Sequence, residues 1–221
     1  MNKEILKELV DHLSDFDHDF QGVQGYTMAD FVGYLNARVD SKPSEIRNLG
    51  GTEEKWVKEH VDPNTEISTL IVFMYRYAVG YFKKALKDSN INTLDEFSFL
   101  IVLMTYPSLS KTELIQKLIM EITSGVEVIK RLLKRRLIEE FANPNDKRSV
   151  LVAITAKGKQ ELAALLPKMG LVGTVVAGNL NAMELTTLSY LLRKLDYYHN
   201  DIFLNNRNLS LEELSEKKKN M

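Results

Sequence analysis

The amino-acid sequence predicts a mainly α-helical fold that contains a winged helix-turn-helix with one small β-hairpin, with long helices before and after it. Over most of the 221 residues, apolar side chains recur at i, i+3, i+4 and i+7, which is the helical spacing. After Arg136 the spacing changes to every second residue, which is typical of a β-hairpin. Helix, short helix, helix and hairpin is the order of elements in a winged helix-turn-helix.

Composition narrows the classes of function. The formal net charge of -1 predicts no general attraction to nucleic acid, so any basic surface must be local. The lack of cysteine excludes disulfides and thiolate metal sites. The four histidines are scattered, and the sequence contains neither a glycine-rich phosphate loop nor a nucleophile elbow. We therefore predict a protein that is not an enzyme and has no cofactor.

The sequence also indicates where the protein resides. The N-terminal segment has acidic residues throughout and no apolar run, which is unlike a signal peptide. The most apolar stretch, residues 97–106, is shorter than the ~20 residues that a membrane span needs. We expect a soluble, cytoplasmic protein.

Residues 1–61 are predicted to form an N-terminal helical extension. Helical spacing marks residues 3–14 and 27–38, and glycines and a proline punctuate the segments around them. The Asp and His side chains of residues 11–19 have a spacing that suits metal ligands on one helix face. An acidic, solvated helix end explains them more simply, and we predict no metal site.

A long helix is predicted within residues 62–92, and Pro63 is a favourable first residue for it. Its apolar face is so wide that its own domain or a partner subunit must cover more than one side. The aromatic side chains on this helix are candidates for a ligand pocket, although core or interface packing is the commoner role of aromatics at helical spacing. The candidate pocket residues are Tyr75, Tyr81 and Phe82.

The winged module is predicted to span residues 93–158. Its first two helices open with capping boxes, in which a hydroxyl accepts from the N3 amide and a glutamate at N3 reaches back. A third helix begins near Glu121 or Ser124 and ends near Arg136, and two short strands follow. The capping pairs are Thr93 with Glu96 and Ser110 with Glu113, and the hairpin comprises strands at 137–141 and 149–154 around a turn at 143–146.

Residues 159–204 are predicted to form the C-terminal helices. The first begins at a threonine cap and should bend or break at a proline and two glycines. The second begins at a capping box and carries a leucine seam to about residue 203. Residues 205–221 are predicted to be a polar, frayed tail. The signals are Thr155 for the first cap, Pro167, Gly170 and Gly173 for the break, and Asn181 with Glu184 for the second cap.

Four segments carry a family resemblance. They are residues 94–97 (LDEF), 129–138 (IKRLLKRRLI), 143–149 (NPNDKRS) and 154–158 (ITAKG), and the acidic and basic pair of the wing with the Thr-x-x-Gly after it is the most specific. Over residues 64–204 the sequence resembles the MarR (multiple antibiotic resistance regulator) family of bacterial transcription factors.

The resemblance implies a homodimer built from the helices of residues 62–92 and 159–204. It implies recognition helices in successive major grooves of a pseudo-palindromic duplex and wings that reach the minor grooves. It also implies that a small aromatic or phenolic ligand near the dimer interface releases the DNA.

Within this frame, the start of the recognition helix, the basic run at its end and the wing tip are the predicted DNA contacts. Arg148 is expected in the minor groove, with Asp146 orienting its guanidinium. Two alternatives stay open: Ser124 and Glu127 form a capping box, and the basic run is a solvated helix end. The predicted DNA-binding residues are Thr123, Ser124, Lys130, Arg131, Lys134, Arg135, Lys147 and Arg148.

Three residues depart from the family pattern. Arg136 stands where the family usually has glycine, and Glu127 and Glu140 stand where basic residues are common. Negative charge near the phosphate path weakens DNA binding. The alternative function is therefore a winged-helix protein-interaction module with little DNA affinity.

Overall fold

The computed structural model describes residues 2–20, 25, 27–39, 62–144 and 146–219. The chain divides into two compact units, Met1–Asp62 and Pro63–Met221. The predicted fold class is confirmed, because the second unit is a mainly helical winged helix-turn-helix.

The first unit contains helices α1 (Lys3–Asp19) and α2 (Met28–Val39). Helix α1 runs five residues past its predicted end because Phe16, near its C-terminus, is 1% exposed and packs against α2. The ring centroid of Phe16 lies 5.3 Å from that of Phe31 and 5.1 Å from that of Tyr34. Aromatic edge contacts of this kind join the two helices.

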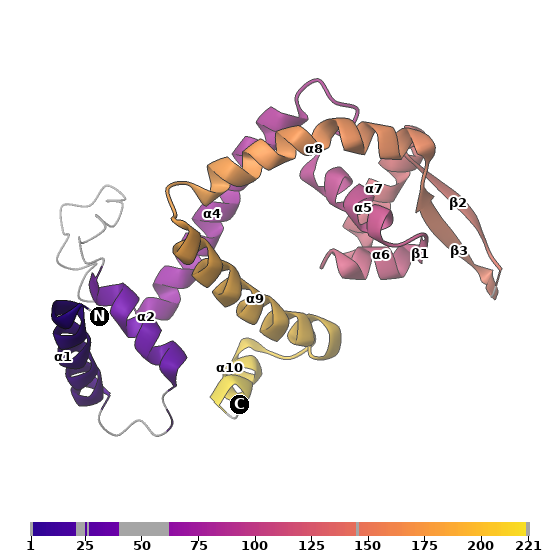
Figure 1. Cartoon of the computed structure of the whole chain (residues 1–221). Coiled ribbons are helices and arrows are strands. Elements are labelled where there is room, and N and C mark those ends of the chain that lie inside the picture. The colour runs from indigo at the N-terminus through magenta and orange to yellow at the C-terminus, as the bar shows by residue number, and fades with distance from the viewer. Residues whose placement is uncertain (1, 21–24, 26, 40–61, 145, 220–221) are drawn as a thin grey trace, which may run out of the picture. The chain divides into compact units, whose positions relative to one another are not determined.

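The second unit begins with a long helix and continues through the winged module to three C-terminal helices (Figure 1). Its elements are α4 (Pro63–Leu86), α5 (Leu94–Thr105), β1 (Leu109–Ser110), α6 (Lys111–Lys117), α7 (Ile122–Lys134), β2 (Ile138–Asn143), β3 (Asp146–Ile154), α8 (Ala156–Ala177), α9 (Ala182–Asn205) and α10 (Leu211–Lys219).

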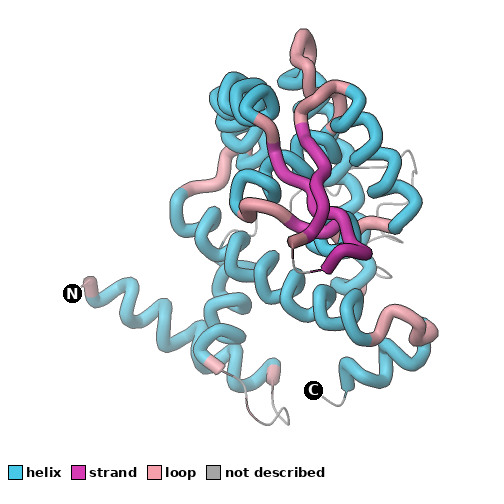
Figure 2. Tube along the Cα trace, turned by 90° about the vertical axis from the view of Figure 1, so that its right-hand side faces the viewer, coloured by secondary structure: helices cyan, strands magenta, loops and turns pink. Residues whose placement is uncertain are grey.

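The sheet has three antiparallel strands in the order β1-β3-β2, one strand more than the predicted hairpin (Figure 2). Leu109 pairs with Val152, and Ser110 pairs with Leu151. A strand of two residues is too short to show an alternating pattern, so the sequence did not reveal β1. Its pairing ties the start of α6 to the wing.

The prediction of a break in α8 was wrong. The helix runs without interruption from Ala156 to Ala177 and includes Pro167. Leu162, Leu165 and Val172 are buried along it, and α4 and α5 pack against it. Burial of this apolar face outweighs the backbone hydrogen bond that a proline in a helix forgoes.

The prediction of a frayed polar tail was also wrong, because residues 211–219 form α10. Its start has the two hydrogen bonds of a capping box. The Ser210 hydroxyl accepts from the Glu213 amide at 3.2 Å, and the Glu213 carboxylate accepts from the Ser210 amide at 2.7 Å. These bonds satisfy two amides at a helix start that are otherwise unpaired.

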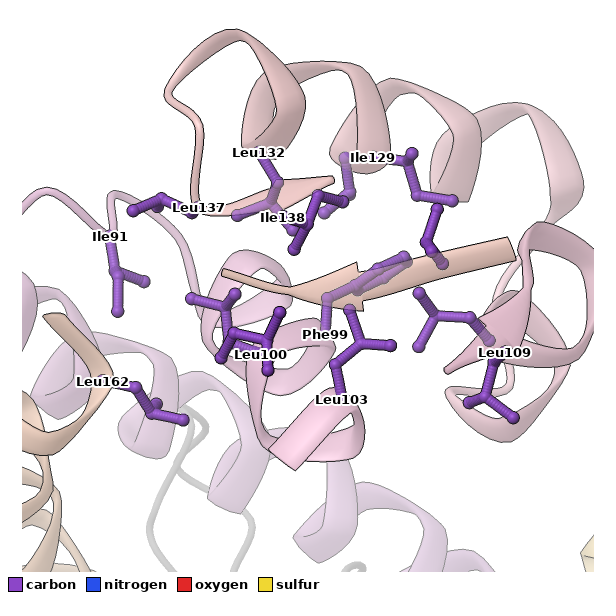
Figure 3. Packing of buried hydrophobic residues seen from close by; sticks show 14 of the residues in the cluster. Ile91, Phe99, Leu100, Leu103, Leu109, Ile129, Leu132, Leu137, Ile138 and Leu162 are labelled. Carbon is purple, nitrogen blue, oxygen red and sulfur yellow. The ribbon is translucent and has the colours of Figure 1, made fainter. Parts of the chain in front are cut away.

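The core of the second unit lies where α5, α6, α7, the sheet and the start of α8 meet (Figure 3). Phe99 and Leu100 of α5 and Leu132 of α7 are all 0% exposed. Ile91 joins this core from the loop after α4. The helix-turn-helix is therefore held in one apolar cluster with the strands that carry the wing.

Among the described residues, no single helix combines the length and apolar character of a membrane span. The bent pair α8 and α9, with 96° between them, meets that test by length and composition only.

Candidate nucleic-acid interface

Helices α6 and α7 form the helix-turn-helix. The predicted capping box at the start of α6 is present: Ser110 accepts from the Glu113 amide at 3.2 Å, and the Glu113 carboxylate accepts from the Ser110 amide at 2.8 Å. The Ser110 hydroxyl also donates to the Glu113 carboxylate at 2.7 Å, and this bond, followed by the one from the Ser110 amide, lowers the pKa of Glu113. Gly125 of α7 lies so close to Ile115 of α6 that a Cβ there would be 2.5 Å from Ile115 Cγ1. The turn needs this close approach.

The start of α7 places Thr123 and Ser124 on the surface. The N-cap is Glu121, which makes no side-chain capping bond. Thr123 and Ser124 follow it in the first helical turn, and both are exposed. The alternative capping box of Ser124 with Glu127 is therefore wrong, because Ser124 lies inside the helix. Exposed residues in this turn are those that meet base edges when a recognition helix enters the major groove.

The two unexpected glutamates are both engaged by lysines. Glu127 accepts from Lys130 Nζ at 2.6 Å, and this contact lowers the pKa of Glu127. Glu140 of β2 lies 2.8 Å from Lys111 Nζ at the start of α6. Each pair cancels one negative charge, but it also occupies one cation that phosphate would otherwise attract.

The basic side chains of residues 130–136 differ in their surroundings, because some are exposed and two are bonded to Glu96. Lys130 and Lys134 are exposed. Arg131 Nε instead donates to Glu96 Oε1 at 3.1 Å, and Arg135 Nη1 donates to Glu96 Oε2 at 2.6 Å. The sequence placed Glu96 in a cap only. The predicted capping box of Thr93 with Glu96 is only half formed: the Glu96 amide donates to the Thr93 hydroxyl, but the Glu96 carboxylate accepts from the Asn92 amide and from α7 and not from the Thr93 amide.

The wing is the β2–β3 hairpin, which extends away from the helices (Figure 1). Asn143 Nδ2 donates to Ser149 Oγ at 2.8 Å, and Ser149 Oγ donates to the carbonyl of Asp146 at 3.2 Å. Lys147 and Arg148 lie within β3. Their side chains are outside the described residues, and so is the orienting contact predicted for the Asp146 carboxylate.

Of the three predicted pocket residues, Tyr81 lines a cavity that the structure describes. Tyr81 lines a cavity of about 380 Å³ between α4 and α8, together with Lys84, Ala85, Lys168, Leu171, Val172 and Val175. Tyr75 is 64% exposed and Phe82 is half-buried, and neither lines this cavity. The cavity is lined mainly by apolar side chains, together with Lys84 and Lys168.

Comparison with known proteins identifies the family. A model described as "Winged helix DNA-binding domain" matches residues 92–158. The transcriptional repressor NicR of Pseudomonas putida is 27% identical over 61% of this chain and 84% of its own length. The multiple antibiotic resistance protein MarR of Salmonella typhimurium is 31% identical over 54% of this chain and 86% of its own length. The chain belongs to the MarR family. Like these MarR-family relatives, it is a transcriptional regulator with a DNA-binding winged helix.

Solved MarR-family structures have the same fold. A mutant MarR of E. coli in complex with operator DNA matches with a TM-score of 0.55 and 27% identity over 61% of this chain and 99% of that one. BpsR of Bordetella bronchiseptica, whose DNA binding is regulated by 6-hydroxynicotinic acid, matches with a TM-score of 0.56 and 26% identity, covering 59% of this chain and 98% of that one.

The residue that replaces the usual MarR glycine adopts a glycine conformation. Arg136 has φ +58°, in the left-handed region that is costly for a residue with a Cβ. We expect Arg136→Gly to raise the free energy of unfolding by about 0.5–1 kcal/mol. This is the backbone strain that glycine relieves, minus the cost of the greater flexibility that glycine gives the unfolded chain. Urea denaturation measures it. Arg136→Ala keeps the Cβ and should give no such gain. An equal gain in both variants would mean that the arginine side chain, and not the backbone, is responsible.

Proposed function

We propose that this chain binds a pseudo-palindromic DNA duplex as a homodimer and releases it when a small aromatic anion binds. The dimer is supported by one observation above all. None of the 24 residues of α9, all of them described, is buried, although the helix carries a seam of leucines. A helix with an uncovered apolar seam needs a partner surface. A two-fold dimer supplies one, and its symmetry suits a pseudo-palindromic site.

The DNA contacts follow from the exposed ends of α7. Thr123 and Ser124 lie at the end that enters a major groove, and Lys134 is exposed near the other end. Lys130 is exposed as well, but it is paired with Glu127. We add Lys147 and Arg148 of the wing from their place in the sequence. Arg131 and Arg135 we leave out of the phosphate contacts, because Glu96 engages both guanidinium groups.

Selection of bound duplexes from a random DNA pool, with affinity then measured against salt, tests this proposal. A regulator of this kind should enrich a pseudo-palindrome whose half-sites lie about one helical turn apart. Its affinity should fall steeply with salt because bound lysines and arginines release counterions. A folded dimer that enriches no duplex would contradict the proposal.

A protein-interaction module is the second candidate. It is favoured by the pairing of Lys111 and Lys130 with glutamates, which removes two cations from the expected phosphate path. Residues 111–148 carry nine Lys and Arg against six Asp and Glu, so the local excess of positive charge is small. Binding to duplex that does not depend on salt, or no binding, is the result that this candidate predicts.

The lining of the cavity at Tyr81 suits a ligand that has both apolar surface and negative charge. Lys84 and Lys168 provide positive charge beside the apolar side chains of Leu171 and Val172. Such a site favours an aromatic carboxylate. We expect 6-hydroxynicotinic acid, tested as a probe of this class, to weaken duplex binding, and Lys168→Gln to reduce that effect about tenfold. Fluorescence anisotropy of labelled duplex measures both. An effect of equal size in Lys168→Gln would place the ligand elsewhere.

A further inference from the structure

A fully buried carboxylate joins the start of α5 to the C-terminal part of α7. Glu96, in the first turn of α5, is 0% exposed and is the single buried charged residue found among those the structure describes. Each of its oxygens is engaged. Oε1 accepts from Arg131 Nε at 3.1 Å, and Oε2 accepts from Arg135 Nη1 at 2.6 Å and from the Asn92 amide at 2.8 Å.

Arg131 and Arg135 are four residues apart, so they lie on one face of α7 and reach the same carboxylate. Arg135 Nη1 also contacts the carbonyl of Asn90 at 3.3 Å. Asn90 Nδ2 in turn donates to Glu161 Oε1 of α8 at 2.6 Å, and Lys157 Nζ donates to the Arg135 carbonyl at 3.0 Å. The C-terminal part of the recognition helix is thus bonded to the loop after α4, to α5 and to α8. We call Glu96, Arg131 and Arg135 the clasp.

We propose that Glu96 is a positioning residue for DNA recognition: through Arg131 and Arg135, its buried carboxylate sets the angle at which α7 presents Thr123 and Ser124 to DNA. The inference rests on the proposed function, in that α7 must enter a major groove.

Leverage along α7 explains why the angle matters. Ser124 and Arg135 are separated by eleven residues, about 16 Å of helix. A tilt of about 5° at the clasp would move the first turn by about 1.5 Å, which is enough to lose hydrogen bonds to base edges. Ionic hydrogen bonds to a dry carboxylate resist such a tilt, because a buried charge that loses a partner is costly.

A positioning role and simple electrostatics predict opposite effects of replacing Glu96 on affinity for DNA. Glu96→Gln removes a negative charge from the DNA-binding module, so charge alone would strengthen binding to phosphate. If Glu96 positions α7, the same variant binds the selected duplex at least tenfold more weakly, while its affinity for unrelated duplex is unchanged or slightly higher. The slope of log affinity against log salt should also stay within about one of the wild-type value, because no phosphate contact is lost.

Glu127→Gln is the matched control. It removes an equal charge from the exposed side of α7, where the carboxylate is paired with Lys130 of the same helix. We expect it to bind the selected duplex as tightly as the wild-type protein or more tightly. Both variants are measured well below their melting temperatures, so that unfolding does not mimic a loss of affinity.

Arg131→Lys gives a second test that does not place a new group in the core. The arginine side chain is 42% exposed, and lysine keeps its charge but loses the guanidinium geometry. We expect a loss of specific affinity of about five- to tenfold with an unchanged salt slope. If Glu96→Gln and Arg131→Lys both fold and both bind the selected duplex like the wild type, the inference is wrong while the proposed function stands. A wild-type protein that binds no duplex would overturn the proposed function, and the inference with it.

Discussion

Gly158→Ala is expected to lower the free energy of unfolding by about 2–4 kcal/mol, although alanine is the better helix former at most helical positions. A Cβ at Gly158 would lie 2.1 Å from the carbonyl oxygen of Leu137. That carbonyl accepts from the Thr155 amide and from the Thr155 hydroxyl, both at 3.1 Å. The clash is therefore with backbone that is held in place, and not with the flexible end of a side chain.

Urea denaturation of the wild type and the variant measures this loss. Gly170→Ala is the control, since it lies in the same helix and a Cβ there would meet nothing within 4 Å. Alanine at that position should leave the stability unchanged or raise it by up to about 1 kcal/mol. Equal stability of the two variants would mean that the start of α8 does not approach Leu137 this closely in solution.

The same contact gives the Thr-x-x-Gly segment a physical reason. Thr155 caps α8 by accepting from the Gly158 amide at 3.0 Å, so the predicted cap is present. Its hydroxyl also reaches the carbonyl of Arg136 at 2.9 Å. The bonds from Thr155 to the carbonyls of Arg136 and Leu137 thus fix how the chain passes from α7 into the wing, and the cap on Gly158 fixes how α8 begins after it. The sequence alone identified the cap, but not the close approach that requires glycine.

Features set by near neighbours in the chain were predicted well. The capping boxes at Ser110 and Asn181 form as expected, because a box involves residues only three apart. The same kind of box forms at Ser210, where the polar composition of the tail predicts fraying. Local signals of this type outweigh composition at helix starts.

Features set by distant residues were not predictable from the sequence. Glu96 has the spacing of a capping residue, and nothing near it indicates that Arg131 and Arg135, 35 and 39 residues away, will bury it. Strand β1 exists because residues far along the chain in β3 pair with it. The basic run 130–136 has five positive charges that the sequence does not distinguish. In the fold, Arg131 and Arg135 are bonded to Glu96.

Leu192→Glu is expected to convert the proposed dimer to a monomer and to reduce affinity for the selected duplex by at least about 100-fold. Leu192 is 49% exposed within one chain, and Leu188, one turn earlier on the same face, is 43% exposed. In a dimer, a glutamate there would bury an unpaired carboxylate in an apolar contact, which is strongly unfavourable. A monomer loses the gain of holding two half-sites at once, which typically amounts to 10²–10⁴ in affinity.

Tyr197→Glu provides the matched control for charge on α9. Tyr197 is 82% exposed and lies about 140° around the helix from Leu192, away from the leucine seam. It should leave both the dimer mass and the affinity unchanged, as measured by light scattering and duplex titration. Because α9 has no buried residue in the single chain, Leu192→Glu should also leave the winged module folded. If Leu192→Glu stays dimeric and binds the duplex normally, the leucine seam is not part of the interface. The exposed face of α4 is then the surface to test next.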